Sequence, residues 1–365
     1  MEVEAATKAQ PVGVSRPPEP RTASIVPRNL LRVAIIAAVA GYYLYNGSSS
    51  NLFQLNSCLL AAVAALALNL LMGTAGQPSL GTTAFLGLGG FGTVALMRGG
   101  LPFVPAVVVC GLVACLGGLI VGLPSLRLRG VYLALATLGA YFFMIYLGNQ
   151  YQNAKAGPAG FVLAPLFGAV PDLTRQRYWC VVLFALLAVT SVVIDGMTSG
   201  RLGRALRMIR DHEAAAPALG IPVTRYKLVA FVFYAAVTAI VGGLGAALVG
   251  NVSTDAYTLS GAISYVAMIV IGGMDSVSGA IIGAFIVTLL PTFVSSETTS
   301  LAGSSFAATY GPSVSEGIYG LAILILVSMG RGGVAGFGRT LWNLAKRHGA
   351  HRLPFAGAKQ DRAAN

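Results

Sequence analysis

Side chains able to perform acid–base, nucleophilic or metal chemistry are scarce in this sequence. The four cysteines lie inside apolar runs and form no C-x-x-C pair: Cys58, Cys110, Cys115 and Cys180. Cysteines in such runs are typical of small buried hydrophobic residues rather than of metal or redox sites. The three histidines lie in polar segments outside these runs: His212, His348 and His351. Because the sequence also lacks H-E-x-x-H, we expect no catalytic residue, no metal site and no cofactor.

One glycine pattern, formed by Gly87, Gly89 and Gly92, matches the dinucleotide fingerprint G-x-G-x-x-G. That fingerprint binds a dinucleotide only after a strand and at the start of a helix. Here the glycines lie in an apolar segment without charges, which favours close helix packing or a broken helix lining a path. A P-loop requires a lysine directly after a glycine, and no lysine follows a glycine. The chain therefore has no ATPase motif of its own.

The elements that carry these residues are apolar segments of membrane-spanning length. Of the 365 residues, 56% are hydrophobic and only 10% are charged, whereas soluble domains carry about 25% charged residues. No charged residue occurs between Arg32 and Arg98, a stretch long enough for more than one span of about 20 residues. The sequence predicts an all-α integral membrane protein with about 8–10 transmembrane helices. The apolar segments are 30–46, 55–73, 79–97, 103–124, 130–148, 178–197, 228–250, 261–275, 278–295 and 316–330.

Three of these segments are expected to be irregular. The third is glycine-rich and is predicted to be broken or re-entrant. The eighth and ninth almost merge through Gly272-Gly273-Met274-Asp275, so they are predicted to be one bent unit or two separate helices.

The distribution of basic residues predicts the orientation, because cytoplasmic loops retain lysine and arginine. With ten spans and an inside N-terminus, most of the 24 basic residues fall in the N-tail, 125–129, 198–227 and the C-tail. The predicted outside set is Arg98, Lys155, Arg175 and Arg177. The net charge of +12 is therefore explained by segment ends, and nucleic acid is not an expected partner.

This orientation divides the chain into three parts. Residues 1–29 are predicted to be a disordered cytoplasmic tail, because they are polar and rich in proline. A signal peptide within 1–47 is the alternative, but its basic region would be too long. Residues 30–330 form the predicted transmembrane domain, and residues 331–365 a basic cytoplasmic tail. That tail is expected to begin with an interfacial anchor, the alternative being a partner-binding site.

Ionisable residues are missing from the inner portions of the apolar segments. Asp195 and Asp275 lie at segment ends, and Asp255 lies in a predicted outside loop. Ion-coupled transporters and proton pumps place such residues within their spans. The chain is therefore either a passive channel or the membrane half of a machine that is powered by another chain.

The polar segment 198–227 bears on this choice. Apolar residues recur there at helical spacing, namely Leu202, Ala205, Leu206, Ile209 and Ala216. Between them lie Arg201, Arg204, Arg207 and Arg210. The pattern predicts a short amphipathic helix that Ser199 caps and that Gly220 and Pro222 end. Such a helix either lies on lipid headgroups or docks into a partner's groove with its apolar face as the anchor.

Several sequence blocks in this part of the chain resemble one known family. Glu213-Ala214-Ala215 with Gly220 resembles the EAA loop of ABC importer permeases, and GRALRMIRDHEAAAPALGI, residues 203–221, resembles the M-type permease of branched-chain amino acid ABC transporters. Further blocks appear in the family's order over roughly residues 55–295. They are Ser79-Leu80-Gly81-x-x-Ala84-Phe85, Arg127-Leu128-Arg129-Gly130-x-Tyr132-x-Ala134-x-x-Thr137-Leu138, Lys227-x-x-Ala230-Phe231 and Gly272-Gly273-Met274-Asp275-Ser276.

The resemblance implies a multi-pass subunit of an ATP-driven importer in the bacterial inner membrane. Its implied partners are a paralogous permease, two cytoplasmic ABC ATPases, an extracytoplasmic substrate-binding protein and membrane lipid. It also implies that the segment 198–227 couples the permease to the ATPases, which hydrolyse the ATP. The implied solute is a branched-chain or related amino acid. A stand-alone channel for a small polar solute is the alternative.

The sequence departs from the family pattern at several positions. Gly220 follows Glu213 by seven residues, one more than in the general EAA pattern. Residues 154–161 (AKAGPAGF) replace a Thr-Gly-Gly-like start, and Asp275 and Ala280 stand where relatives often have Gly and Pro.

Two further sets of residues have predicted roles. The translocation path is expected to be lined by Ser79, Thr82, Thr83, Thr137 and the glycines of the third segment, with helix packing as the alternative role. Arg127 and Arg129 are expected to fix the topology, with a second ATPase contact as the alternative.

Overall fold

The computed structural model describes residues 47–125, 130–164, 166–168 and 170–302, together with Gly41, Gly317, Gly320, Leu321 and Leu324. The predictions for the two tails, for the first and last apolar segments apart from these isolated residues, and for Arg127 and Arg129 lie outside the described residues.

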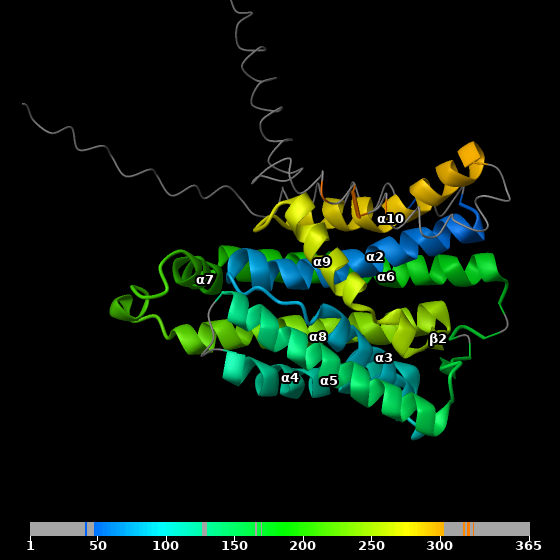
Figure 1. Ribbon diagram of the computed structural model, residues 1–365, viewed down its shortest axis with the longest axis horizontal. Coiled ribbons are helices and arrows are strands. Elements are labelled where there is room, and N and C mark those ends of the chain that lie inside the picture. Colours follow the sequence, from blue (N-terminus) through cyan, green and yellow to red (C-terminus); the bar gives the residue numbers. More distant parts are fainter. Residues whose placement is uncertain are drawn as a thin grey trace, which may run out of the picture.

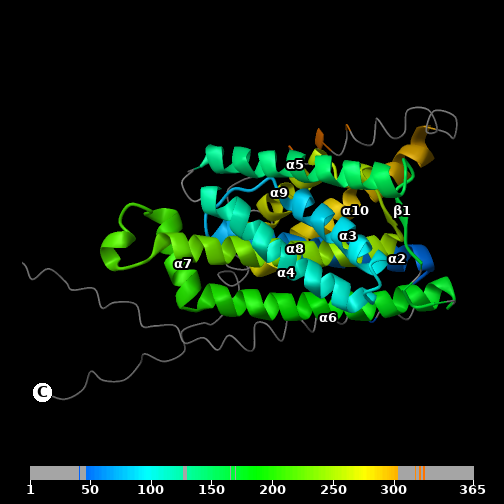
Figure 2. The same cartoon turned by 90° about the horizontal axis from the view of Figure 1, so that it is seen from below.

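The described chain is a bundle of helices with one minimal strand pair (Figures 1 and 2). The membrane helices are α2 (Ser49–Asn69), α3 (Thr82–Arg98), α4 (Phe103–Ser125), α5 (Val131–Lys155), α6 (Asp172–Ser199), α8 (Val223–Val249), α9 (Leu259–Gly272) and α10 (Val277–Ala302). The remaining elements are the π-helical turn η1 (Leu70–Thr74), α7 (Arg201–Asp211), the 3-10 turns η2 (Pro217–Leu219) and η3 (Thr254–Ala256), and strands β1 (Phe161–Val162) and β2 (Asn251–Val252).

Apolar length confirms a multi-pass membrane protein. Six described helices are long and apolar enough to cross a membrane: Ser49–Thr74, Phe103–Pro124, Val131–Lys155, Asp172–Ser199, Val223–Val249 and Thr254–Gly272. The stretch Val277–Phe293 of α10 is apolar but shorter, and α3 has 17 residues. The second to ninth apolar segments of the sequence are thus each helical in the described chain.

Helix α2 forms the centre of the bundle, because it is apolar on all sides. In its most apolar stretch 89% of the residues are buried, and it packs against α6, α8, α9 and α10. In the most apolar stretches of the peripheral helices α5 and α6, only 22% and 28% of the residues are buried. Their exposed apolar faces therefore suit lipid or a second membrane subunit.

Glycine lets α3 approach the backbone of α8, as the glycine pattern predicted. A Cβ atom built on Gly89 would lie 1.9 Å from the Ala239 carbonyl oxygen. On the opposite helix, a Cβ on Gly242 would lie 2.1 Å from the Leu86 carbonyl oxygen. Any side chain at either position would force the two helices apart.

The third apolar segment is interrupted before its helix rather than within it. Helix α3 runs without a break, and residues 76–81 ahead of it are not helical. The start of α3 is fixed by a hydrogen bond from the Tyr234 hydroxyl to Thr82 Oγ1, 2.9 Å long. Tyr234 lies about 9 Å along α8 from Leu228, where the predicted apolar segment 228–250 begins, at 1.5 Å per residue. Helix α3 therefore starts inside a hydrocarbon core of about 30 Å rather than at its edge.

Charged residues lie at opposite ends of the bundle. At one end, Arg98 Nη1 donates to the Lys155 carbonyl oxygen at 3.2 Å, and β1 pairs with β2 antiparallel. At the other end lie α7 and the turn at Asp275, which joins α9 and α10 as two separate helices packed on each other. This separation agrees with the basic-residue pattern, and which end faces the cytoplasm stays a prediction.

Candidate functional site

Helix α7 forms where the sequence placed an amphipathic helix, but its start differs from the prediction. The N-cap is Gly200, which offers no capping side chain. Ser199 is the last residue of α6, and its hydroxyl donates back to the Asp195 carbonyl oxygen. The predicted capping role of Ser199 is therefore wrong, because its side chain already serves the preceding helix.

The helix also ends earlier than predicted. Its last residue is Asp211, not a residue near Gly220 and Pro222. The break lies at His212, whose φ of −143° and ψ of 69° are not helical. Pro217 would stop any continuation of the helix, because a proline inside it would remove a hydrogen bond to residue 213 and clash with its carbonyl group. Gly220 instead ends the short turn η2 with a φ of 74°, a left-handed conformation that suits glycine.

The apolar face of α7 is buried within this chain. Leu206 and Ile209 are 0% and 1% exposed, and they contribute to the side of α7 that faces the bundle. The prediction that this face anchors in a partner's groove is therefore wrong, because the chain's own helices cover it. The part that projects beyond the other helices is the segment 212–220, here called the tip (Figures 1 and 2). At the tip Ala214, Ala215 and Gly220 are exposed, and Leu219 is 66% exposed.

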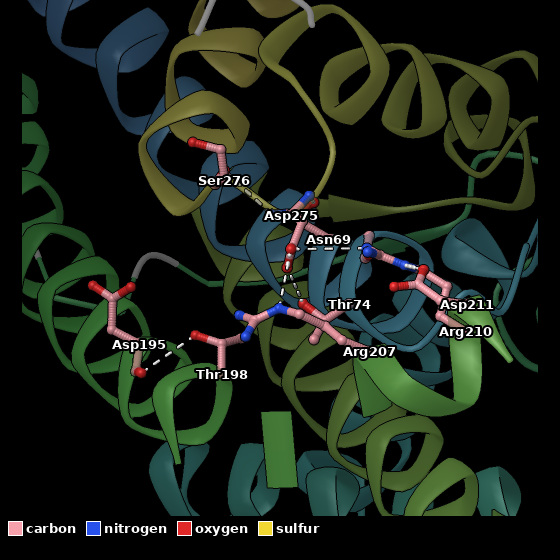
Figure 3. A network of polar contacts seen from close by, with 10 residues as sticks. Asn69, Thr74, Asp195, Thr198, Arg207, Arg210, Asp211, Asp275 and Ser276 are labelled. Atoms are coloured by element: carbon pink, nitrogen blue, oxygen red, sulfur yellow. Dashed lines mark hydrogen bonds and ion pairs between the residues drawn. The ribbon is translucent and has the colours of Figure 1, made fainter. Parts of the chain in front are cut away.

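Two of the four arginines of α7 hold it against the membrane helices (Figure 3). Arg207 Nε pairs with Asp275 Oδ2 at 3.1 Å, and Arg210 Nη1 lies 3.8 Å from the same oxygen. Arg210 Nη1 also donates to the Gly73 carbonyl oxygen at the end of η1. Its Nε donates to Asp211, which lowers the pKa of that exposed carboxyl group. Both arginines therefore contact this chain, while their side chains stay 36% and 31% exposed.

Asp275 is itself fixed by the end of α2 and η1. Its amide donates to Asn69 Oδ1 at 3.1 Å, and its Oδ1 accepts from the Thr74 hydroxyl at 2.9 Å. Its φ of 65° is in the left-handed region, where glycine is unstrained and aspartate is better tolerated than most residues. The left-handed φ explains why a glycine could occupy position 275. The aspartate adds a carboxylate that pairs with Arg207 and Arg210.

The other two arginines of α7 and the EAA-like glutamate have contacts that do not involve Asp275. Arg201 and Arg204 are exposed, and Arg204 Nη1 donates to the Ser199 carbonyl oxygen at 3.2 Å. Glu213 Oε1 accepts from Lys227 Nζ at 2.7 Å, and the Lys227 side chain is only 10% exposed. Glu213 therefore ties the tip to the start of α8.

The four residues predicted to line a path lie near the start of α3. Ser79, Thr82, Thr83 and Thr137 are all buried. Thr137 Oγ1 accepts from the Leu80 amide at 3.0 Å, and Ser79 Oγ accepts from the Gly81 amide at 3.3 Å. Ser79 and Thr137 thus satisfy backbone groups of the interruption, as any backbone inside a membrane requires. Their role in a path stays a prediction.

A cavity of about 230 Å³ lies between α3 and α5 in the described chain. Its lining is almost wholly apolar: Gly87, Leu88, Phe91, Gly92, Ala95, Met144, Leu147, Gly148 and Tyr151. None of the four predicted hydroxyl residues lines it.

Sequence reasoning missed three functional positions: Asp275 as the anchor of α7, Asn69 as its support, and Tyr234 as the partner of Thr82. Asn69 gave a signal, because it is a polar residue inside a long apolar segment. The partners of each lie far away along the chain, so no local pattern reveals the pairs.

Comparison with known proteins identifies relatives of this chain. The family described as branched-chain amino acid transport system / permease component matches residues 50–328. The high-affinity branched-chain amino acid transport system permease protein LivM of Salmonella typhimurium is 30% identical over 71% of this chain and 66% of its own length. LivM of Escherichia coli is 31% identical over 73% of this chain and 68% of its own length. The chain thus spans about two thirds of these relatives. A solved structure, PsaBC from Streptococcus pneumoniae in complex with Fab, is 15% identical with a TM-score of 0.41, and the match covers 80% of this chain and 95% of that one.

Proposed function

The chain belongs to the family of branched-chain amino acid transport system permease components, and from this we propose that it is the membrane-spanning subunit of an ATP-driven importer. The proposed cargo is a branched-chain or related amino acid, as the names of the LivM relatives suggest. The proposed location is the inner membrane of a bacterium. The proposed partners are two cytoplasmic ABC ATPases, a paralogous permease and an extracytoplasmic binding protein.

The observation that carries the coupling role is the contrast between the tip and its base. The tip is exposed and projects past the membrane helices, whereas its base is held by buried apolar residues and ion pairs. A projecting segment on a rigid base can transmit a push from a docked ATPase into α6 and α8, which flank it in sequence. An exposed leucine at the tip, Leu219, offers the apolar contact that a docking groove recognises.

Two anchoring points would spread this push through the bundle. Arg207 and Arg210 connect α7 to the turn between α9 and α10 and to the end of η1. The Glu213–Lys227 pair connects the tip to α8. Movement of the tip would therefore reach α2, α8, α9 and α10 together, which is what a switch between inward and outward access requires.

The poorly buried faces of α5 and α6 support an arrangement with further membrane components. Phe142, Phe143 and Tyr146 of α5 are each more than half exposed. Such faces would meet lipid or the paralogous permease subunit.

The proposal is tested by co-purification of the ATPases with the permease in detergent. Leu219→Glu places a charge at the centre of the proposed contact and is expected to abolish co-purification. Leu219→Met keeps an apolar side chain of similar volume and is the matched control. If Leu219→Glu retains the ATPases as wild type does, the tip is not the docking site.

A second experiment separates this function from that of a stand-alone channel. Glu213→Lys sets a like charge beside the nearly buried Lys227 and is expected to release the ATPases and to stop amino acid accumulation in vesicles. Solute flux through this chain alone, unaffected by Glu213→Lys, would indicate a channel instead.

A further inference from the structure

The start of α3 is a helix N-terminus within the membrane layer that the chain leaves without a cap. Gly81 at the N-cap provides no side chain, and the first paired amide of the helix is that of Phe85, which donates to the Gly81 carbonyl oxygen at 3.2 Å. In the described chain the amides of Thr82, Thr83 and Ala84 make no hydrogen bond. Unpaired amides are costly at this depth, and together with the helix dipole they favour an anion.

A second helix start lies beside it and differs in one respect. Helix α9 is capped by Thr258, whose Oγ1 accepts from the Gly261 amide at 3.1 Å. The two starts touch, because Thr83 Cγ2 lies 3.3 Å from the position of a Cβ atom on Gly261. The positive ends of two helices thus meet at one place, and only one of them has a capping side chain.

Thr83 adds an independent observation at this place. Its side chain is 2% exposed, and its hydroxyl has no hydrogen-bond partner. It sits in the uncapped first turn of α3, where its methyl carbon Cγ2 faces Gly261 in the first turn of α9. Thr93 and Thr238 also have unpaired buried hydroxyls, but they lie in the interior of α3 and α8, where no free amides accompany them.

Exposed hydroxyl groups lie close to this buried place. Thr258 and Ser260 in the first turn of α9 are exposed, although the 14 residues of α9 place them about 21 Å from its far end. Exposed hydroxyl groups at that depth suit a water-filled path better than lipid. The apolar cavity between α3 and α5 begins at Gly87, one helical turn beyond Thr83.

We propose that the first turn of α3, with its free amides and the Thr83 hydroxyl, transiently binds the carboxylate of the transported amino acid. This inference rests on the proposed function and adds the place where the cargo's charged end is held in the membrane. The adjacent apolar cavity would receive the aliphatic side chain. Because the first turn of α9 covers Thr83 in this structure, α3 and α9 must separate for the carboxylate to enter.

The test is ATP-driven uptake of radiolabelled L-leucine by the complete transporter in proteoliposomes, with saturating binding protein. Thr83→Val removes the hydroxyl and is expected to lower uptake about tenfold, and Thr83→Ser to restore most of it. Thr93→Val, a matched change at an unpaired buried threonine on the same helix, is expected to transport as wild type does. Equal losses in Thr83→Val and Thr93→Val, or no loss in either, would overturn the inference.

A second pair of variants places a competing anion at the site. Gly81 has room for a side chain, because the nearest atom to its Cβ position is 3.4 Å away. Gly81→Asp provides a carboxylate cap that is expected to occupy the site and abolish uptake, whereas neutral Gly81→Asn is expected to lose less. Both should retain the ATPases on co-purification. Equal uptake by Gly81→Asp and Gly81→Asn would count against the inference, whereas no leucine uptake by the wild-type complex would refute the proposed function instead.

Discussion

The backbone leaves the helical conformation in two regions, residues 212–220 and residues 76–81. Different kinds of side chains stabilise these two regions. At the tip, residues 212–220, the backbone leaves the helix in water, and the surrounding anchors are charged: Arg207, Arg210, Asp275, Glu213 and Lys227. At residues 76–81, inside the membrane, the partners are neutral hydroxyls and carbonyls. The difference shows that charged groups attach the tip at the surface, whereas neutral hydroxyl groups satisfy the amides of Leu80 and Gly81 inside the membrane.

The two regions also differ in what their variants should change. Because the tip is proposed to transmit force, its substitutions should affect coupling more than stability. Because the interruption is satisfied by single hydrogen bonds, substitutions there should affect stability first.

The largest expected effect is that of Gly220→Pro at the tip. Gly220 has a φ of 74°, which proline cannot adopt, so the turn must change shape. Leucine uptake by the reconstituted transporter is expected to be abolished, while membrane insertion stays intact. Gly220→Asn is the control, because asparagine tolerates this conformation and no atom lies within 4 Å of the Cβ position. Normal uptake by Gly220→Pro would show that transport does not depend on the shape of the tip.

Arg207→Glu should come next, because it turns an attraction to Asp275 into a repulsion. Uptake is expected to fall by at least about tenfold, as α7 loses its seat on the turn between α9 and α10. Adding Asp275→Asn removes the repulsion and is expected to restore part of the uptake. If the double variant is no better than Arg207→Glu alone, the arginine acts on something other than Asp275.

Thr137→Val tests the interruption inside the membrane. It removes the acceptor of the buried Leu80 amide, and the unpaired amide should cost about 1–3 kcal/mol of stability. A lower midpoint of thermal unfolding in detergent is expected, with Thr137→Ser close to wild type. An unchanged midpoint in Thr137→Val would show that another group satisfies this amide.

Asp275→Gly should have the smallest effect of the four. It removes the hydrogen bond from Thr74 and the ion pairs with Arg207 and Arg210, whose side chains are 36% and 31% exposed against 27% for Asp275, and partly exposed pairs contribute about 0–1 kcal/mol each. Glycine also relieves the strain of a φ of 65°. Thermal unfolding is expected near the wild-type midpoint and uptake reduced less than in Arg207→Glu. A loss equal to that of Arg207→Glu would mean that the carboxylate is essential.

The sequence predicted what depends on local patterns. Apolar length marked the membrane helices, and the alternation of leucine and arginine after Gly200 marked α7. The glycine pattern in the third segment correctly indicated close packing, seen at Gly89.

What the sequence could not provide depends on distant pairs. Asp275 meets Arg207 across 68 positions, and Thr82 meets Tyr234 across 152. The apolar face of α7 could equally have suited lipid or a partner, and only packing shows that its own bundle covers it. Helix α7 ends at Asp211, well before Pro217, although the helical spacing of Ala216 had suggested a longer helix.

The most direct test of this account is accumulation of radiolabelled leucine in vesicles supplied with binding protein and ATP. The account predicts accumulation against a gradient only when this chain, its paralogous permease and the ATPases are all present, and none when the tip carries Leu219→Glu. Accumulation by the permease chains without the ATPases would contradict it.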